Sequence, residues 1–306
     1  MKEYAHLPRR DHLVTPVQLA AWVATGMPAH WRVCEIGFGA LPAFITSHIP
    51  GASYLDTSEL ESAPLWNKVS DATLEAVLLR HGIRIDTTVI LYGRNNLAAA
   101  RAAHLMLYAG VADVRLLDGG YTGWRALGVP CERGPARVVA AAADFGARVP
   151  VHPGYLLDIA AARRLHGEDA TRLVSVRTWN EFIGQTSGYS YIDARGDIPG
   201  ALFGRIVNDD DINGMSEFHT VDGAMADPQR IRQIWTDASI DPACHTVFYC
   251  GTGWRASLAF FYAWLMGWEH IGVFDGGWCE WSRDPANPVV CRIDSDADAD
   301  ADADAN

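Results

Sequence analysis

The 306-residue sequence contains no run of 18 apolar residues, so no transmembrane helix is predicted. Residues 1–11 are polar and charged and lack the apolar core of a secretory leader. Basic residues are also scarce: 25 Lys and Arg stand against 37 Asp and Glu, which gives a net charge of −12 at pH 7. An acidic chain of this kind disfavours nucleic acid and anionic membranes as partners.

Cysteine is present but lacks the spacings that would bind metal. The six cysteines form no CxxC pair and no Cys/His metal pattern, and a chain of this length needs no disulfide staples. We therefore expect reduced thiols and a cytoplasmic location. The positions are Cys34, Cys131, Cys244, Cys250, Cys279 and Cys291.

The chain is an internal duplication. At an offset of 157 residues, Asp118-Gly119-Gly120-Tyr121 recurs as Asp275-Gly276-Gly277-Trp278. Earlier in each copy, His48-Ile49-Pro50-Gly51-Ala52 recurs as Asp197-Ile198-Pro199-Gly200-Ala201 at an offset of 149. Two matching segments in the same order indicate a tandem repeat. The predicted boundaries are a first domain at 8–130, a linker at 131–148, a second domain at 149–291, and an acidic Asp-Ala tail at 292–306 that is disordered by composition.

Each copy alternates short apolar runs with helical patterns. This order is typical of an α/β fold in which a small parallel sheet is flanked by helices. The predicted strands are Val33–Ile36, Thr88–Tyr92 and Val114–Leu117 in the first copy, and Leu173–Val176, Thr246–Tyr249 and Gly272–Phe274 in the second. The predicted helices are Leu97–Ala109 and Ser257–Met266.

The loop from Cys250 to Arg255 is the candidate catalytic site. An apolar strand ends at Cys250, a glycine-rich turn follows, and a helix begins soon after. Backbone amides at a helix N-terminus favour an anion, so a cysteine there is expected to be a nucleophilic thiolate. Arg255 closes the loop and is expected to stabilise negative charge, although it could instead be a surface residue packed on Trp254. The predicted cradle consists of Gly251, Thr252, Gly253 and Trp254.

The first copy lacks both the cysteine and the arginine of this loop. At the 157-residue offset, Gly93 stands where the second copy has Cys250, and Ala98 stands where it has Arg255. The first copy is therefore predicted to be catalytically silent and to have a structural role, as one wall of the active cleft.

The Cys-Gly-Thr-Gly-Trp-Arg loop resembles the active-site loop of the rhodanese superfamily, whose members carry sulfur as a cysteine persulfide. The similarity covers about residues 8 to 291 and is strongest to multidomain bacterial rhodaneses with this loop, a group that includes a polysulfide-dependent ergothioneine synthase. Cysteine phosphatases have five residues between Cys and Arg, whereas only four separate Cys250 from Arg255. The shorter loop favours one added sulfur over a phosphate. The resemblance implies two rhodanese-like domains, the second catalytic, with no metal or organic cofactor.

The resemblance also bears on the substrate. The thiosulfate and mercaptopyruvate sulfurtransferases that this chain resembles have two donor-binding arginines in the region that corresponds to Trp179–Asp197. Here Glu181 stands at the first of these positions and the Tyr189–Tyr191 segment at the second. Arg177 or Arg195 could substitute. A tyrosine offers an apolar body and a hydrogen-bonding tip, which suits a neutral or cationic heteroaromatic acceptor. Candidate substrate-binding residues are Tyr191, Tyr189, Arg177, Arg195 and Trp278, although both tyrosines and Trp278 could simply pack.

The predicted activity is sulfur transfer by double displacement through Cys250, from thiosulfate or a polysulfide to a thiophilic small molecule. Two alternatives stay open: delivery of the sulfur to carbon of a small imidazole such as hercynine, and a non-enzymatic persulfide carrier or phosphatase-like binding module. Cys279 is a candidate resolving thiol. No protein partner is identified.

Overall fold

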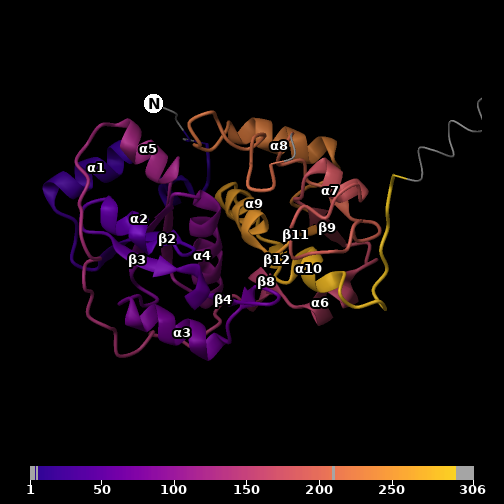
Figure 1. The fold of residues 1–306 in the computed structure, drawn as a ribbon, viewed down its shortest axis with the longest axis horizontal. Helices are drawn as coiled ribbons and strands as arrows, with labels where there is room; N and C mark the ends of the chain where they lie inside the picture. The colour runs from indigo at the N-terminus through magenta and orange to yellow at the C-terminus, as the bar shows by residue number, and fades with distance from the viewer. Residues whose placement is uncertain (1–3, 5, 209–210, 294–306) are drawn as a thin grey trace, which may run out of the picture.

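The computed structural model describes residues 4, 6–208 and 211–293, and the acidic tail from residue 294 lies outside this part of the chain. Two five-stranded sheets, one in each half of the chain, lie side by side with helices around them (Figure 1). All pairings within these two sheets are parallel. The α/β fold with two helix-flanked parallel sheets confirms the fold class predicted from the repeat.

The two sheets have the same strand order, as expected for a duplication. The first runs β1-β7-β6-β2-β3 and the second β8-β12-β11-β9-β10. The first comprises β1 (Leu13–Val14), β7 (Asp113–Leu117), β6 (Thr88–Gly93), β2 (Trp31–Gly37) and β3 (Ser53–Asp56). The second comprises β8 (Leu156–Leu157), β12 (Ile271–Phe274), β11 (His245–Tyr249), β9 (Thr171–Ser175) and β10 (Leu202–Phe203). The six predicted strands are all present within two residues of their predicted ends.

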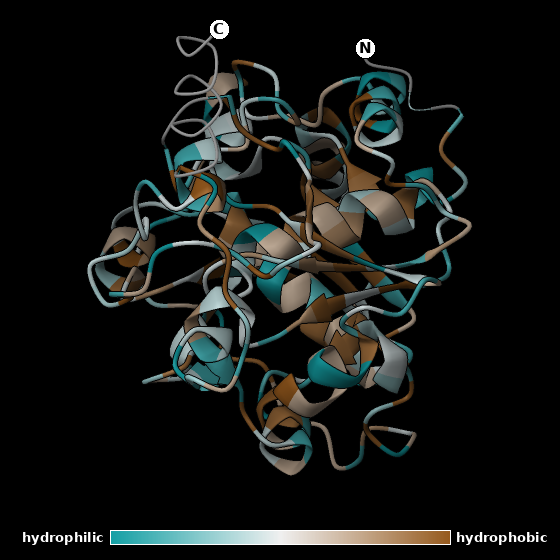
Figure 2. Cartoon of the chain, turned by 90° about the vertical axis from the view of Figure 1, so that its right-hand side faces the viewer, coloured by the Kyte–Doolittle hydropathy of each residue, from teal (hydrophilic) through white to brown (hydrophobic). Residues whose placement is uncertain are grey.

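Helices cover the sheets of both halves. The first half has α1 (Pro16–Thr25), α2 (Leu41–Thr46), α3 (Asp71–Arg80), α4 (Asn96–Ala109) and α5 (Gly120–Ala126). The second half has α6 (Ile159–Leu165), α7 (Trp179–Ile183), α8 (Pro228–Asp237), α9 (Trp254–Leu265) and α10 (Gly277–Trp281). Short 3-10 turns lie at Arg10–His12, Thr57–Glu59 and Pro153–Tyr155, and a two-stranded ribbon joins β4 (Glu61–Ser62) to β5 (Asn67–Lys68). Figure 2 shows hydrophobic strands inside and helices of mixed polarity around them.

The equivalent helices α4 and α9 pack against each other between the two halves (Figure 1). Nearly every residue of both helices is buried, and one apolar cluster runs continuously from the first half into the second. His104 on α4 lies in this interface, where burial and the nearby Arg101 lower its pKa to about 4. A continuous apolar interface of this kind places the carboxyl ends of the two sheets in a fixed relation.

The helix after the Cys250 loop begins at Trp254, three residues earlier than predicted. Gly253, with φ of 102°, ends the turn, so the loop contains only residues 250–253. In the described part of the chain, no helix has the length and apolarity needed to cross a bilayer. The cytoplasmic location stays a prediction from the sequence.

Candidate active site at the domain interface

Cys250 lies where β11 meets α9. The amide of Gly253 donates a hydrogen bond to Cys250 Sγ over 3.1 Å. No side chain caps α9, because its N-cap residue is Gly253. The positive end of the helix dipole therefore acts close to the sulfur, an arrangement that stabilises negative charge on a thiolate or persulfide.

The Asp-Gly-Gly turn of the second copy, Asp275–Gly277, places the start of α10 in hydrogen-bonding contact with the Cys250 loop. The amides of Trp278 and Cys279 donate to the carbonyls of Cys250 and Gly251 over 2.8 and 3.0 Å. A Cβ on Gly277 would lie only 2.4 Å from the carbonyl oxygen of Cys250, so this close approach requires glycine. The motif recurs in both halves because it forms the turn that supports the loop at the end of the central strand.

Arg255 is buried, and its guanidinium donates hydrogen bonds to other side chains of the protein. Its Nη1 and Nη2 donate to the two carboxylate oxygens of Glu181 over 2.8 and 3.0 Å, and Nη2 also donates to the Tyr189 hydroxyl over 2.8 Å. Burial raises the pKa of Glu181, but Arg255 and then Arg177 outweigh it and lower the pKa to about 2. Arg255 thus positions Tyr189, and its charge is already balanced by a carboxylate.

Sequence reasoning missed Glu181, which it noted only as the place of an absent arginine. The signal was available as a Thr-x-x-Glu capping box, because the Glu181 carboxylate accepts the Thr178 amide and Thr178 caps α7. In the structure, Glu181 also pairs with Arg255, which is 74 residues away along the chain. No local pattern reports a partner at that distance.

The other predicted arginines do not reach the cavity. Arg177 is fully buried, where it donates to the Gly196 carbonyl and contacts Glu181 and Asp197. Arg195 is exposed. Neither arginine is among the residues that line the cavity beside the loop.

Both predicted tyrosines line that cavity, and Trp278 does not. The Tyr189 ring lies over the loop so closely that a Cβ on Gly251 would meet its Cε2 at 2.2 Å. Tyr191 is 45% exposed and interacts with the Thr252 hydroxyl, and burial raises its pKa. Trp278 is buried in the second half, where its Nε1 donates to the Ala194 carbonyl over 3.0 Å.

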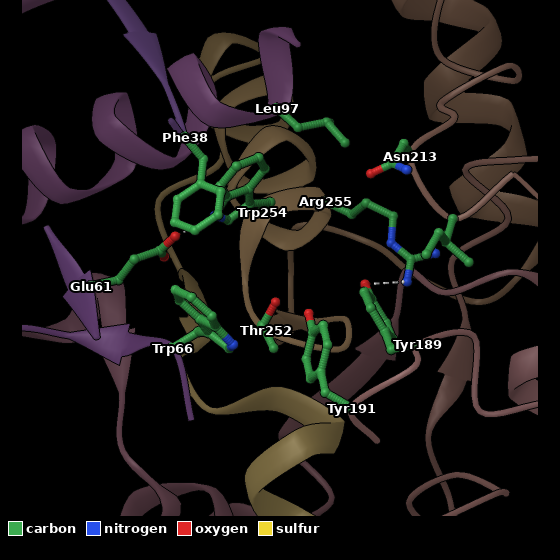
Figure 3. A pocket seen from close by; sticks show the side chains of 11 residues that line it. Phe38, Glu61, Trp66, Leu97, Tyr189, Tyr191, Asn213, Thr252, Trp254 and Arg255 are labelled. Carbon is green, nitrogen blue, oxygen red and sulfur yellow. Dashed lines mark hydrogen bonds between the residues drawn. The ribbon is translucent and has the colours of Figure 1, made fainter. Parts of the chain in front are cut away.

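The cavity has a volume of about 240 Å³ and draws its lining from both halves of the chain (Figure 3). This size suits a small metabolite. The wall that the first copy was expected to provide is present, although its residues were not identified from the sequence. The lining residues are Phe38, Glu61, Trp66, Leu97, Tyr189, Tyr191, Ile212, Asn213, Thr252, Trp254 and Arg255.

A polar network joins the first half to the Cys250 loop. Trp254 Nε1 donates to Glu61 over 2.6 Å, and Arg101 bridges Glu61 and Asp275 over 3.0 and 2.5 Å. The Asp275 carboxylate also accepts the Lys68 amide over 2.8 Å. Burial raises the pKa of Glu61 to about 7, against the lowering influence of Arg101. The loop is therefore held by both halves of the chain.

The equivalent place in the first copy is filled by side chains. The Gly93 amide donates to Asn96 Oδ1 over 3.2 Å, and Asn95 caps α4. Arg94 turns away to pair with Glu35 over 2.9 Å. Side-chain amides thus take the backbone donors that the second copy leaves available.

Cys279 is buried beside the loop, and burial raises its pKa. A raised pKa disfavours the thiolate needed to attack a persulfide, which argues against a resolving role. In the part of the chain that the structure describes, no cluster of three His, Cys, Asp or Glu side chains could hold a metal ion.

Comparison with known proteins gives consistent matches. The rhodanese-like domain family matches residues 41–127 and 158–284. The thiosulfate sulfurtransferase YnjE of Escherichia coli is 52% identical over 93% of this chain, which spans 66% of the length of YnjE. A probable 3-mercaptopyruvate sulfurtransferase of Pseudomonas aeruginosa is 30% identical over 91% of this chain and 97% of its own length.

Solved structures of similar proteins have the same fold. The crystal structure of YnjE superimposes with a TM-score of 0.89 at 50% identity, covering 93% of this chain and 69% of that one. The anaerobic ergothioneine biosynthesis enzyme of Chlorobium limicola, solved with its substrate trimethyl histidine, superimposes with a TM-score of 0.88 at 36% identity. That match covers 94% of this chain and 72% of the other.

Proposed function

The chain belongs to the family of rhodanese-like domain proteins, and from that premise we propose that it is a sulfurtransferase that carries sulfane sulfur as a persulfide on Cys250. The observation that carries the proposal is the hydrogen bond from the Gly253 amide to Cys250 Sγ, at the start of an uncapped helix and beside a cavity of metabolite size. A sulfur anion at this position is stabilised by backbone dipoles that need no reorganisation. The sulfurtransferase relatives support the same activity.

The reaction proceeds in two displacements. The Cys250 thiolate attacks the outer sulfur of the donor, an S–S bond forms, and the donor's bond to that sulfur breaks with its electron pair; thiosulfate would leave as sulfite. The acceptor then attacks the outer sulfur of the persulfide, and the Cys250 thiolate leaves. The amide of Gly253 stabilises the cysteine sulfur before loading and after unloading.

The charges around the site favour a polysulfide, whose two negative ends are separated by neutral sulfur atoms, over the compact dianion thiosulfate. Arg255 and Arg177 are both paired with buried carboxylates, so neither offers an unbalanced charge to thiosulfate. A polysulfide needs fewer charged contacts because much of its length is uncharged sulfur. We therefore place polysulfide first and thiosulfate second among donors.

A second candidate function is sulfur delivery to carbon of a small imidazole, as the C. limicola relative supports. The favouring observation is the half-exposed Tyr191, which interacts with the Thr252 hydroxyl at the cavity. Its phenol could exchange a proton or hydrogen bond with an imidazole. The imidazole carbon would take the outer sulfur and lose its proton, and the Cys250 thiolate would leave.

The test is the substitution Cys250→Ser. Wild-type protein treated with polysulfide should gain about 32 Da at Cys250, the mass of one sulfur atom, and should release it to cyanide or glutathione. The variant should show neither the gain nor turnover while keeping the wild-type circular dichroism spectrum. Cys279→Ser is the matched control and should load normally. Turnover retained by Cys250→Ser would refute the assignment.

A further inference from the structure

A second cavity, the β2 cavity, lies at the amino end of β2 and has a volume of about 330 Å³. It is lined by Trp31, Arg32 and Val33 at the start of this strand. The carboxyl end of the same strand leads to Phe38, which lines the cavity beside Cys250. A strand of seven residues spans about 20 Å, so the two cavities are separate sites.

Two arginines line the β2 cavity, and neither forms an ion pair within the part of the chain that the structure describes. Arg32 donates from Nη1 to the carbonyls of Ala29 and Trp31 over 2.7 and 2.9 Å. Its Nε is buried and has no hydrogen-bond partner among the described residues. Burial and, after it, the nearby Arg137 lower the pKa of the Arg32 guanidinium. Two neighbouring cations favour an anion beside them.

The second copy has an equivalent cavity, the β9 cavity, at the amino end of β9, with a volume of about 310 Å³. Arg172 lines it and stands 140 residues after Arg32. Arg172 repeats a contact of Arg32, because its Nη1 donates to the carbonyl oxygen three residues before it, that of Asp169, over 2.6 Å. The glycine of the repeated Ile-Pro-Gly-Ala turn lines both cavities, as Gly51 and Gly200.

The two cavities differ in the charges that line them. Glu168 and Asp169 line the β9 cavity. At the same offset the first copy has Pro28 and Ala29, which carry no charge. The first copy adds Arg137 from the segment between the two halves. The same guanidinium position thus has acidic neighbours in one copy and a second cation in the other.

Glu132 lies near the β2 cavity, but its carboxylate is engaged outside the lining. It accepts the Gly51 amide over 2.7 Å and lies 3.8 Å from Nε2 of His48. The described lining of the β2 cavity includes two arginines and no Asp or Glu. In a chain with a net charge of −12, this local excess of positive charge favours the binding of an anion.

We propose that Arg32 and Arg137 form a binding site for a small dianionic oxyanion of the phosphate or sulfate type. A guanidinium offers N–H donors in a planar fork that matches two oxygens of such an ion, and two forks can hold it from two sides. Met27 and Val138 line the same cavity, whose volume leaves room for a carbon body, as in a phosphate monoester. The proposal goes beyond sulfur transfer and does not depend on it. It gives the first half of the chain a ligand of its own.

The test measures binding to the full chain. Inorganic phosphate and phenyl phosphate are titrated at constant ionic strength, and binding is followed by calorimetry and by the thermal midpoint. Both should bind and raise the midpoint, whereas chloride at the same ionic strength should not. Tighter binding of phenyl phosphate would assign the site to an ester, and equal affinity would assign it to the bare ion. No binding of either at about 10 mM would overturn the proposal.

Variants locate the site. Arg137→Ala should weaken phosphate binding at least about tenfold, because it removes charged hydrogen bonds to the ion. Arg137 is exposed, so the fold should tolerate this change. Arg133→Ala is the matched control, because Arg133 is an exposed arginine of the same segment and does not line the cavity. Unchanged phosphate affinity in Arg137→Ala, or an equal loss in Arg133→Ala, would contradict the assignment.

The second copy suggests a test of charge. Ala29→Asp gives the β2 cavity the carboxylate that Asp169 brings to the β9 cavity, and it should weaken phosphate binding at least about tenfold by repelling the ion. Ala29→Asn adds nearly the same shape without charge and should keep the affinity within about twofold. Equal losses in the two variants would mean that crowding acts there instead of charge, and would count against the anion site.

Oxyanion binding and sulfur transfer can fail separately. Cys250→Ser should abolish persulfide formation and leave phosphate binding unchanged, whereas Arg137→Ala should leave loading of Cys250 unchanged. Phosphate binding without any persulfide in the wild type would refute the transferase and keep the anion site. Loss of phosphate binding in Cys250→Ser would place the ion at the Cys250 loop and overturn the second site.

Discussion

The carboxylate of Glu181 holds the guanidinium of Arg255 through two hydrogen bonds of 2.8 and 3.0 Å, with both side chains buried. An arginine beside a catalytic loop would ordinarily serve an anionic substrate. Here its charge is balanced inside the protein, and its remaining contact is with Tyr189. The pair therefore holds Arg255 in a fixed position at the wall of the cavity.

The first prediction concerns this pair. Arg255→Ala should destabilise the fold by about 3–5 kcal/mol, because the buried Glu181 carboxylate would keep only the Thr178 amide and the longer ion pair to Arg177. The double variant Arg255→Met, Glu181→Leu should be less destabilised than Arg255→Ala, because neither charge is left unpaired. Urea unfolding followed by circular dichroism measures both.

Arg195→Ala is the control for this experiment. Arg195 is exposed, so its removal should change the free energy of unfolding by no more than about 0.5 kcal/mol. A wild-type free energy of unfolding in Arg255→Ala would show that the pair is not structural.

The second prediction concerns acid stability. The pKa of Glu181 is about 2 in the folded protein and about 4.3 in an unfolded chain. A depressed pKa stabilises the fold above about pH 4.3, and this contribution is lost as pH falls from there toward 2. The full loss should be about 3 kcal/mol, since a difference of one between the folded and unfolded pKa corresponds to about 1.4 kcal/mol.

Urea midpoints between about pH 6 and about pH 3 measure the first part of this loss. The slope of stability against pH should be shallower in Glu181→Gln, which has no carboxyl to protonate, even though that variant is less stable near neutral pH. Parallel curves for the two proteins would assign the acid sensitivity to other groups.

The third prediction separates the two tyrosines. Tyr191→Phe should leave loading of Cys250 with sulfur nearly unchanged and should slow unloading, because the phenol lies at the cavity mouth with Thr252 and not on the cysteine. Mass spectrometry follows loading, and single-turnover experiments with hercynine, cyanide and glutathione follow unloading. Slowing with hercynine alone would favour the imidazole reaction, whereas equal slowing with all three would indicate a general role.

Tyr189→Phe is the matched variant. Its hydroxyl is bonded to Arg255, so its loss should lower stability by about 1 kcal/mol and leave the choice of acceptor unchanged. If Tyr191→Phe changes neither half-reaction, Tyr191 only packs against the loop.

The fourth prediction concerns the first copy. Gly93→Cys should not create a second persulfide site, because a Cβ at Gly93 would lie 2.4 Å from the Asn95 carbonyl oxygen. In a Cys250→Ser background, this substitution should lower the thermal midpoint and add no sulfur to residue 93 on treatment with polysulfide. A gain of about 32 Da at position 93 would mean that the loop can rearrange.

The sequence alone determined the architecture and the position of the candidate nucleophile. The Asp-Gly-Gly repeat and the apolar runs are local patterns, and local patterns report strands, turns and helix starts. They located β6, β11 and α4 to within a residue or two, and they placed Cys250 at the carboxyl end of a central strand. The start of α9 was misplaced by three residues because the conformation of Gly253, which closes the loop, was not anticipated.

Only the tertiary structure decided what surrounds the sulfur. The packing of the two halves brings Glu61 of β4 to Trp254, 193 residues away along the chain, and Glu181 reaches Arg255 from a different helix. Such contacts join side chains whose separations follow no period, so no pattern along the chain encodes them. The sequence showed that Arg255 closes the loop. Only the structure showed that this arginine is buried and paired with Glu181.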